Sequence, residues 1–422
     1  MHTGCYIDGE WVQPRSERIL KNVNPSNTED VIAEFPAATP NEVERAVAGA
    51  QKAFERWRRV PAPERARVVW RATEIARRRA DELARMLARE EGKVLKEAQG
   101  EIKKGNSILE FYAGEGFRIQ GRTLPSEVAD VFTYTIRRPL GVVGLITPWN
   151  FPYAIPCWKI APALVAGNTC VFKPAGLTPG TAAILVEVFE EAGLPPGCLQ
   201  MVVGPGSTVG DAIVRHPAIQ AISFTGSTPV GLGLNALAAE RGAKVTCEMG
   251  GKNAVVALPG ADVDNVVASV LNGAFGSTGQ RCTATSRLLV HEELRAQVTE
   301  ALVEGARAIR VGDALEEGSQ MGPAVDARQF QTDLEYIAVG KQEARLLTGG
   351  GRPAGLEGGY FVEPTIFTEV EPEHRIFREE IFGPVLSICP IKDLEDGIAK
   401  ANAVEFGLTA SIYTPDIGQA MR

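Results

Sequence analysis

Three polar side chains of this sequence lie in segments that could shape a reactive site, and the first is a cysteine. Cys282 follows Gly276 and Gly279, which permit a strained turn that would expose the thiol. A thiol that attacks a carbonyl needs thiolate character, a donor for the oxyanion that forms and a base for the second step. A cysteine is more often a buried inert side chain, and we accept that interpretation for the other six.

A base and an oxyanion donor for this thiol must come from elsewhere in the chain. A papain-type histidine is disfavoured, since only four histidines occur and none lies in a matching motif. Glu248, beside Gly250 and Gly251, is the remaining economical base, although a lone glutamate there is more often a surface charge. Asn150, between two prolines, is a candidate amide donor, although a lone asparagine there is more often a turn residue.

The elements that would position these residues alternate between short apolar strands and helices. Apolar runs such as 142–146 and 221–224 are separated by helical segments, which is typical of βαβ units and a parallel sheet. A second series, with a strand at 254–258 and a helix at 263–275, follows a predicted domain boundary near Gly250. Parallel α/β sheets bind ligands beyond the carboxyl ends of their strands, so we expect function in the loops that follow strands.

The amino-terminal part predicts three helices. Thr39, Pro40 and Glu42 form the pattern of an N-cap, a first-turn proline and a capping-box glutamate. A second helix is expected over 63–91 and a third over roughly 96–117.

The length and composition of the chain exclude several classes of protein. The 422 residues are enough for two to three domains, and the net charge of −8 argues against a nucleic-acid partner. No apolar run approaches the ~20 residues that a membrane span requires. Seven scattered cysteines without a CxxC pair predict reduced thiols and a cytoplasmic location. No zinc-ligand spacing and no GxSxG elbow occur, so we expect no metal and no serine-hydrolase chemistry.

A glycine turn after one predicted strand could bind a phosphate. Gly226 and Ser227 could present backbone N–H groups to a pyrophosphate at a helix N-terminus. This signal alone is weak, because the GxGxxG fingerprint is absent and 204–206 only approaches it.

Taken together, these segments resemble the aldehyde dehydrogenase superfamily along the whole chain. Glu248 and Cys282 lie 34 residues apart, in the contexts Glu-Met-Gly-Gly-Lys and Gly-Gln-Arg-Cys that the family uses for its base and nucleophile. Asn150 in Pro-Trp-Asn-Phe-Pro matches the oxyanion donor, and 380–384 matches the segment that holds the nicotinamide ribose and ring. The resemblance implies NAD(P)-dependent oxidation of an aldehyde to the acid, through a thiohemiacetal and a thioester on Cys282 that water then hydrolyses with Glu248 as base.

The resemblance also implies an α/β fold with two Rossmann-like parallel-sheet domains and a small β oligomerisation arm. The dinucleotide-binding domain would comprise 1–120 and 139–249, the arm 121–138 and the catalytic domain 250–422. Family members usually continue well beyond a segment like 407–411, so we expect a truncated catalytic domain. A homo-dimer or tetramer is expected if the carboxyl terminus is intact.

By the same resemblance, the dinucleotide is expected to contact loops of both domains. The expected cofactor-binding residues are Ile146, Thr147, Pro148, Trp149, Lys173, Ala175, Gly176, Gly206, Gly210, Phe224, Thr225, Gly226, Ser227, Val230, Met249, Gly250, Glu380 and Phe382. One departure concerns the choice between NAD and NADP. Many NAD-preferring relatives carry a ribose-binding glutamate where this chain has Gly176, so a 2′-phosphate is not repelled and Lys173 could pair with it. The sequence therefore favours acceptance of NADP.

The expected substrate pocket contains Phe151, Trp158, Arg281 and Thr283. The contexts around Trp158 and Glu248 resemble the 2,5-dioxopentanoate (α-ketoglutaric semialdehyde) dehydrogenase group. The two aromatic rings suit an aliphatic portion of a substrate. Arg281 could meet a substrate carboxylate, and a structural role for it is an equally good interpretation.

Two alternatives stay open at this point. One is a non-catalytic, dinucleotide-binding relative that lost activity through truncation. The other is a thioester hydrolase or acyltransferase that uses Cys282 without a dinucleotide. Calorimetric measurement of dinucleotide binding and turnover separates them.

Overall fold

The structure, a computed structural model, describes residues 1–422, which form two compact units. The first unit comprises 1–22, 31–87 and 98–248, and the second comprises 23–30, 88–97 and 249–422. Two short segments therefore leave the domain in which the sequence analysis placed them, namely 23–30 and 88–97. Within the second unit they are tied together by Arg89, whose Nε donates to Asp30 Oδ2 at 2.9 Å. The assignment of cofactor binding and catalysis to two separate domains stays a prediction.

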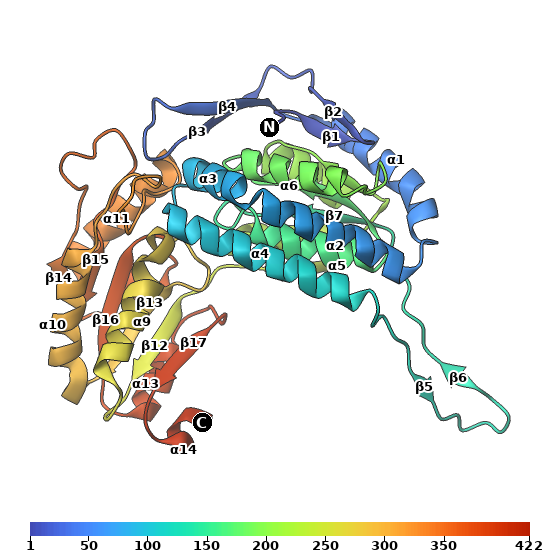
Figure 1. The fold of residues 1–422 in the computed structure, drawn as a ribbon. Helices are drawn as coiled ribbons and strands as arrows, with labels where there is room; N and C mark the ends of the chain where they lie inside the picture. Colours follow the sequence, from blue (N-terminus) through green and yellow to red (C-terminus); the bar gives the residue numbers. More distant parts are fainter. The chain divides into compact units, whose positions relative to one another are not determined.

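The first unit is built on a seven-stranded sheet with the order β11-β10-β7-β8-β9-β1-β2. The five central and outer strands β7 to β11 run parallel, whereas β1 and β2 pair antiparallel at one edge. The strands are β1 (Cys5–Ile7), β2 (Glu10–Val12), β7 (Val142–Ile146), β8 (Thr169–Lys173), β9 (Leu199–Met201), β10 (Ile219–Thr225) and β11 (Lys244–Glu248) (Figure 1).

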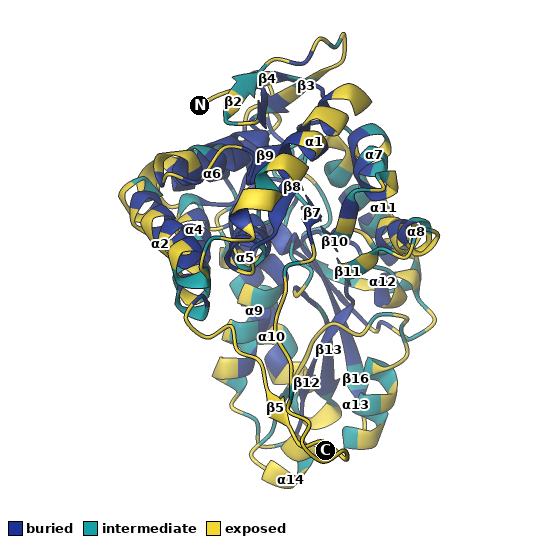
Figure 2. Ribbon diagram, turned by 90° about the vertical axis from the view of Figure 1, so that its right-hand side faces the viewer, coloured by how far each residue is buried: buried dark blue, intermediate teal, exposed yellow.

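Helices cover both faces of this sheet, as expected for a parallel α/β sheet. On one face, α1, α7 and α8 bury apolar side chains such as Val47 and Ile213 against Val142 and Ile222 of the strands. On the other face, α2 packs against α5 and α6. The strands β1, β7, β8 and β9 are fully buried, as are the inner sides of these helices, whereas the edge strands β2 and β11 are partly exposed (Figure 2). The helices are α1 (Pro40–Trp57), α2 (Ala62–Arg78), α3 (Ala80–Glu91), α4 (Leu95–Glu115), α5 (Ala154–Val165), α6 (Pro179–Glu191), α7 (Asp211–Arg215) and α8 (Thr228–Ala239).

The amino-terminal helices agree with the sequence patterns in part. The capping box of α1 is present, with the Thr39 N–H donating to Glu42 Oε2 at 2.8 Å. The single helix expected over 63–91 is wrong, since α2 ends at Arg78 and α3 starts at Ala80. Arg79 leaves helical geometry between them, and its guanidinium bonds Glu82 and Glu187.

The predicted arm is a hairpin of two short antiparallel strands, β5 (Thr123–Leu124) and β6 (Thr133–Tyr134) (Figure 1). Its apolar side chains are exposed, including Leu124, Phe132 and Tyr134. A further hairpin, β3 (Ile19–Val23) with β4 (Val31–Pro36), forms a sheet of its own.

The second unit holds a six-stranded sheet with the order β14-β15-β16-β13-β12-β17, in which only β14 runs antiparallel to its neighbour. Helices α9 and α10 pack on one face, and α11, α12 and α13 pack on the other. The strands are β12 (Asn253–Ala257), β13 (Thr285–His291), β14 (Arg345–Thr348), β15 (Thr365–Thr368), β16 (Val385–Ile391) and β17 (Ala410–Tyr413). The helices are α9 (Val263–Phe275), α10 (Glu292–Ala308), α11 (Ala327–Glu343), α12 (Arg375–Arg378), α13 (Leu394–Ala401) and α14 (Ile417–Met421).

The predicted α/β class with parallel sheets is thus confirmed. None of the helices combines the length and the apolar character that a membrane crossing requires.

Candidate active-site segments

In the first unit, the predicted site segments gather at one edge of the sheet. The register pairs Ile146 with both Lys173 and Phe224, and it pairs Thr225 with Glu248. The carboxyl ends of β7, β8, β10 and β11 therefore share this edge. From β7 the chain continues outward on one side to β8 and β9. It then crosses back to the other side of β7 and forms β10 and β11. The edge therefore contains a topological switch point, where α/β sheets bind ligands.

The helix that follows β10 begins without a side-chain cap. Ser227 at its N-cap makes no capping hydrogen bond, and the first turn of α8 carries no acidic residue. The hydroxyl oxygens of Thr225 and Thr228 are buried there without hydrogen-bond partners. A Cβ at Gly226 would lie 2.5 Å from the Phe224 ring, so only glycine fits this turn. Unsatisfied donors at a helix N-terminus fit a pyrophosphate.

Lys173, at the end of β8, is a buried lysine whose Nζ donates to the Pro174 carbonyl at 2.8 Å. Burial lowers its pKa to about 8. A Cβ at Gly176 would meet only the end of the Leu20 side chain, at 3.3 Å, and a Cβ at Gly206 would meet nothing within 4 Å. The segment thus has the open surface that a ribose or phosphate requires, beside a lysine. The residues of this edge fit a dinucleotide.

The asparagine and the glutamate of the predicted triad lie in this unit too. Asn150 is buried in the loop after β7, and Glu248 is exposed at the end of the edge strand β11. The loop is fixed where it enters α5, because Glu101 Oε1 accepts the N–H groups of Tyr153 at 2.9 Å and Ala154 at 3.1 Å. The helix α5 begins at Ala154, directly after this loop.

Lys159 is a functional candidate that the sequence analysis did not assign. It lies on α5 and donates to Ser223 Oγ at 2.7 Å. Burial lowers its pKa to about 8, while the negative charge of Glu248 acts in the opposite direction. A charge in the apolar stretch 154–165 was the available signal.

In the second unit, Cys282 follows a turn with unusual backbone geometry. Ser277, Thr278 and Gly279 have φ values of 49°, 57° and 69°. Positive φ is costly for a β-branched residue such as Thr278, on the order of 1–3 kcal/mol. Two bonds hold the turn, from the Ser277 N–H to Glu97 Oε1 at 2.8 Å and from Thr278 Oγ1 to the Gly322 carbonyl at 3.0 Å. A strained turn is therefore present, as predicted, and its first residue with positive φ is Ser277, directly after Gly276.

The cysteine itself is anchored through its carbonyl. Asn253 Nδ2 donates to the carbonyl oxygens of Cys282 and Ala284, both at 2.8 Å. Cys282 and Cys247 are the two cysteines that are only half-buried, and the other five are buried. Burial raises the pKa of Cys247, whose thiol donates to the Gly231 carbonyl at 3.6 Å.

The segments of the second unit do not follow strands, and this corrects the sequence-based expectation. Cys282 comes just before β13 and the 380–384 segment comes just before β16, so both lie at the amino edge of the sheet. The turn that precedes Cys282 and the 380–384 segment border one small cavity of about 10 Å³, which is lined by residues that include Gly279, Arg281, Glu380 and Phe382.

Glu380 and Phe382 are held firmly on this edge. Glu380 Oε1 accepts the Gly251 N–H at 3.0 Å, and a Cβ at Gly250 would lie 2.0 Å from Glu380 Oε2. Burial raises the pKa of Glu380. Phe382 has φ of 61°, a conformation rare for a bulky residue.

The Arg281 side chain bonds to backbone carbonyls of its own unit. This arrangement argues against the hypothesis that it binds a substrate carboxylate. Its Nε donates to the Gly276 carbonyl at 2.9 Å and its second terminal nitrogen donates to the Asn272 carbonyl at 2.8 Å. These bonds satisfy carbonyls at the C-terminus of α9, which is the structural role weighed as the alternative. Thr283 is exposed, and Phe151 and Trp158 belong to the first unit.

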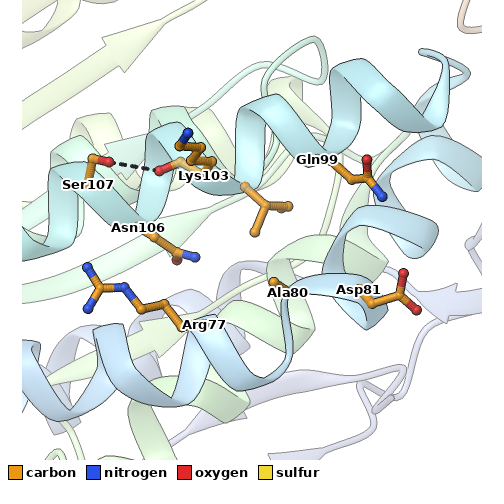
Figure 3. A pocket seen from close by; sticks show the side chains of 8 residues that line it. Arg77, Ala80, Asp81, Gln99, Lys103, Asn106 and Ser107 are labelled. Carbon is orange, nitrogen blue, oxygen red and sulfur yellow. Dashed lines mark hydrogen bonds between the residues drawn. The ribbon is translucent and has the colours of Figure 1, made fainter.

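A surface pocket of about 420 Å³ lies elsewhere, between α4 and the α2–α3 junction (Figure 3). Two of its polar side chains are already engaged, since Ser107 donates to the Lys103 carbonyl and Arg77 pairs with Glu110. It contains none of the predicted site residues.

The family of this chain follows from its similarity to known proteins. The aldehyde dehydrogenase family model matches residues 11–422. The chain belongs to the aldehyde dehydrogenase family. It is an NAD(P)-dependent enzyme that oxidises aldehydes, which favours this interpretation over both alternatives weighed from the sequence.

Among curated relatives, the α-ketoglutaric semialdehyde dehydrogenase of Bacillus subtilis is 44% identical over 99% of this chain and 86% of its own length. The 2,5-dioxopentanoate dehydrogenase of Saccharolobus solfataricus is 44% identical over 97% of this chain and 85% of its own length. The resemblance drawn from the motifs is confirmed.

Solved structures agree with this aldehyde dehydrogenase fold. A betaine aldehyde dehydrogenase from Staphylococcus aureus in complex with NAD+ is 33% identical, with a TM-score of 0.97 over 100% of this chain and 84% of that chain. An NADP-dependent enzyme from E. coli is 36% identical, with a TM-score of 0.97 over 100% of this chain and 87% of that chain.

Proposed function

We propose that this aldehyde dehydrogenase forms a thioester on Cys282, with Asn150 as oxyanion donor and Glu248 as general base. One observation carries the proposal. Cys282 is a half-buried thiol at the end of a strained turn, with its carbonyl fixed by Asn253. Such strain persists only where the surroundings fix it, and it concentrates at functional sites.

In the first step, the Cys282 thiolate attacks the aldehyde carbon and a C–S bond forms. The carbonyl oxygen becomes an oxyanion, which the Asn150 amide and the Cys282 N–H stabilise. Removal of one such donor costs roughly 3–4 kcal/mol of transition-state stabilisation. A nicotinamide held by Glu380 and Phe382 would supply hydride acceptance at this carbon, and the product on Cys282 would then be a thioester.

In the second step, Glu248 accepts a proton from water, and the oxygen of that water attacks the thioester carbon. The C–S bond breaks, the acid leaves and the Cys282 thiolate is restored. The exposed position of Glu248 gives water access to its carboxylate. Lys159 supplies positive charge at Glu248 when it is protonated, and its pKa of about 8 makes this influence dependent on pH.

For the cofactor, we propose that α8 and its preceding turn hold the pyrophosphate and that Lys173 and Gly176 face the adenosine ribose. NADP acceptance is supported by the absence of a carboxylate at Gly176 and by the buried amine of Lys173. The similarity to an enzyme described as NADP-dependent is in line with this. The ribose and ring of the nicotinamide are assigned to Glu380 and Phe382.

For the substrate, we propose a semialdehyde that carries a carboxylate, with 2,5-dioxopentanoate first. Two relatives at 44% identity carry the corresponding names. Phe151 and Trp158 suit its aliphatic portion. Its carboxylate needs a partner other than Arg281, because that side chain is engaged with the end of α9.

The decisive experiment is a screen of NAD(P)H formation over matched aldehydes. We expect 2,5-dioxopentanoate to give a higher kcat/KM than succinate semialdehyde or betaine aldehyde, with both NAD+ and NADP+ accepted. Equal kcat/KM for 2,5-dioxopentanoate and for an uncharged aldehyde of the same length would contradict the proposed substrate.

We also propose that the enzyme is a homo-oligomer that works in the cytoplasm. The exposed apolar side chains of the β5–β6 hairpin support association, because a monomer leaves Leu124, Phe132 and Tyr134 in water. The seven free cysteines fit a reducing compartment.

A further inference from the structure

Asp333 is a carboxyl group with no exposed surface, in the middle of α11. Gln329 Nε2 donates to its Oδ1 at 2.8 Å, and Oδ2 has no hydrogen-bond partner. Burial raises its pKa well above the usual range, and no cation acts on it. A buried carboxyl without a cation is stable only in its neutral, protonated form.

The titratable groups near Asp333 are engaged elsewhere. On its own helix, the Tyr336 hydroxyl donates to Glu379 Oε2 at 2.7 Å. On the segment before β16, Glu380 accepts the Gly251 N–H and Glu379 also pairs with Arg375. The hydrogen bond to the Asp333 carboxyl therefore comes from a neutral group, the Gln329 amide.

The carboxyl packs against the turn that contains Phe382. A Cβ at Gly383 would lie 2.0 Å from Asp333 Oδ1, and its three nearest atoms would all belong to the Asp333 carboxyl. The Gln329 amide that bonds Asp333 also donates to the Ile381 carbonyl at 3.1 Å. The two side chains of α11 thus fix the residues on both sides of Phe382, whose φ of 61° requires such support.

The same contact extends to the cysteine turn. A Cβ at Gly279 would lie 2.3 Å from the Gly383 carbonyl oxygen, so the turn before Cys282 rests directly on Gly383. Asp333, Gly383 and Gly279 therefore form one packed series from α11 to the nucleophile turn.

We propose that Asp333 is a positioning residue, which as a neutral acid holds the 381–383 turn and thereby places Phe382 for the nicotinamide and supports the turn before Cys282. This inference rests on the proposed function, which assigns the nicotinamide to Phe382. It adds a residue of α11 that touches neither substrate nor cofactor and acts through Gly383.

The first test compares Asp333→Asn with Asp333→Ala. Asparagine keeps the shape and the contact with Gly383, whereas alanine removes both. We expect Asp333→Ala to raise the dissociation constants for NAD+ and NADP+ about tenfold, because the 381–383 turn is then less ordered and must be ordered on binding. Asp333→Asn should restore it to within about twofold of wild type. Equal dissociation constants for wild type and Asp333→Ala would overturn the positioning role.

A thermal-unfolding series without cofactor tests the neutral state independently. The raised folded-state pKa means that Asp333 contributes stability below its unfolded pKa, and this contribution falls as pH rises toward the folded value. The Tm difference between Asp333→Asn and wild type should therefore widen from pH 5 to pH 8. Glu335→Gln, the same change at an exposed position of α11, should show no such widening. A constant difference for Asp333→Asn would overturn the neutral state.

A double-mutant cycle tests the contact itself. Gly383→Ala should lower Tm in wild type, because its Cβ meets the Asp333 carboxyl. In an Asp333→Ala background the same change should cost much less, since that carboxyl is gone. Additive losses would overturn the contact. Cys282→Ala separates this inference from the proposed function. Loss of the nucleophile should abolish aldehyde oxidation, which tests the proposed function, but it should leave dinucleotide binding and the Asp333–Gly383 double-mutant cycle unaffected.

Discussion

The carboxyl edge of the first sheet and the amino edge of the second hold their functional segments by different physical means. At the first edge, the turn of Gly226 and Ser227 has no positive φ, and binding capacity comes from unsatisfied groups at the start of α8. At the second edge, Ser277, Thr278 and Phe382 have positive φ, and close packing holds them there. An edge that binds phosphates needs exposed donors, whereas an edge that forms a covalent bond needs fixed geometry.

The buried lysines differ between the two edges in the opposite sense, because the unsatisfied one lies at the second edge. Lys159 and Lys173 of the first unit each donate a hydrogen bond, to Ser223 and to the Pro174 carbonyl. Lys252 of the second unit is fully buried with no hydrogen-bond partner on Nζ, beside the buried Arg287. The second edge therefore tolerates unsatisfied groups that lower stability.

The largest effect should come from the nucleophile at the second edge. Cys282→Ala should reduce steady-state NAD(P)H formation by at least about four orders of magnitude, because the proposed mechanism forms the thioester on Cys282 alone. Dinucleotide binding by calorimetry should persist, since the proposed phosphate sites lie at the first edge. Cys247→Ala is the matched control, and it should retain activity. Equal losses in both variants would contradict the division of roles.

The base at the first edge comes next. Glu248→Gln should slow turnover by about 10²–10⁴-fold, since a positioned base contributes this much. A pre-steady-state burst of NAD(P)H should remain, because only thioester hydrolysis is impaired. Stopped-flow absorbance measures both phases. Loss of the burst in step with turnover would place Glu248 in the first step instead.

Cofactor choice should respond to a single position of the first edge. Gly176→Glu should lower the ratio of kcat/KM for NADP+ over NAD+ about tenfold, because the new carboxylate repels a 2′-phosphate. Only the tip of Leu20 needs to move to admit the side chain. Gly176→Gln, which adds the same bulk without charge, is the control. Equal ratios for the two variants would remove charge as the cause.

The smallest effect is on stability at the second edge. Burial, with a further contribution from Arg287, lowers the pKa of Lys252 to about 7. Its stabilising contribution is complete above the unfolded lysine pKa and is lost as pH falls toward 7. Lys252→Met should therefore raise Tm by a few degrees at pH 7 and by less at pH 9.5. A larger gain at pH 9.5 would contradict the neutral buried amine.

The sequence predicted the first edge better than the second. In the first unit, the strand at 142–146 and the capping box at Thr39 could be predicted from local patterns, because periodicity and capping are local. The helix at 263–275 of the second unit was predicted in the same way, but it does not contain the second edge. The rule that loops after parallel strands bind ligands located the first edge. It does not apply to Cys282, which precedes a strand. The glycines before that residue and its motif context identified it instead.

Other features depend on contacts between distant segments and left no local pattern. The inward turn of Arg281 is set by carbonyls at the end of α9. Likewise, the Glu97 carboxylate accepts a hydrogen bond from the Ser277 N–H, which lies 180 positions away in the sequence. The break at Arg79 depends in part on its bond to Glu187, which belongs to α6.

The central claim, a thioester on Cys282, is tested most directly by trapping it. Glu248→Gln mixed with an aldehyde and NAD(P)+, quenched in acid and digested, should yield one peptide that carries the added acyl mass, and fragmentation should place it on Cys282. Acylation of Cys247 instead, or a burst of NAD(P)H with no acylated cysteine, would contradict the account.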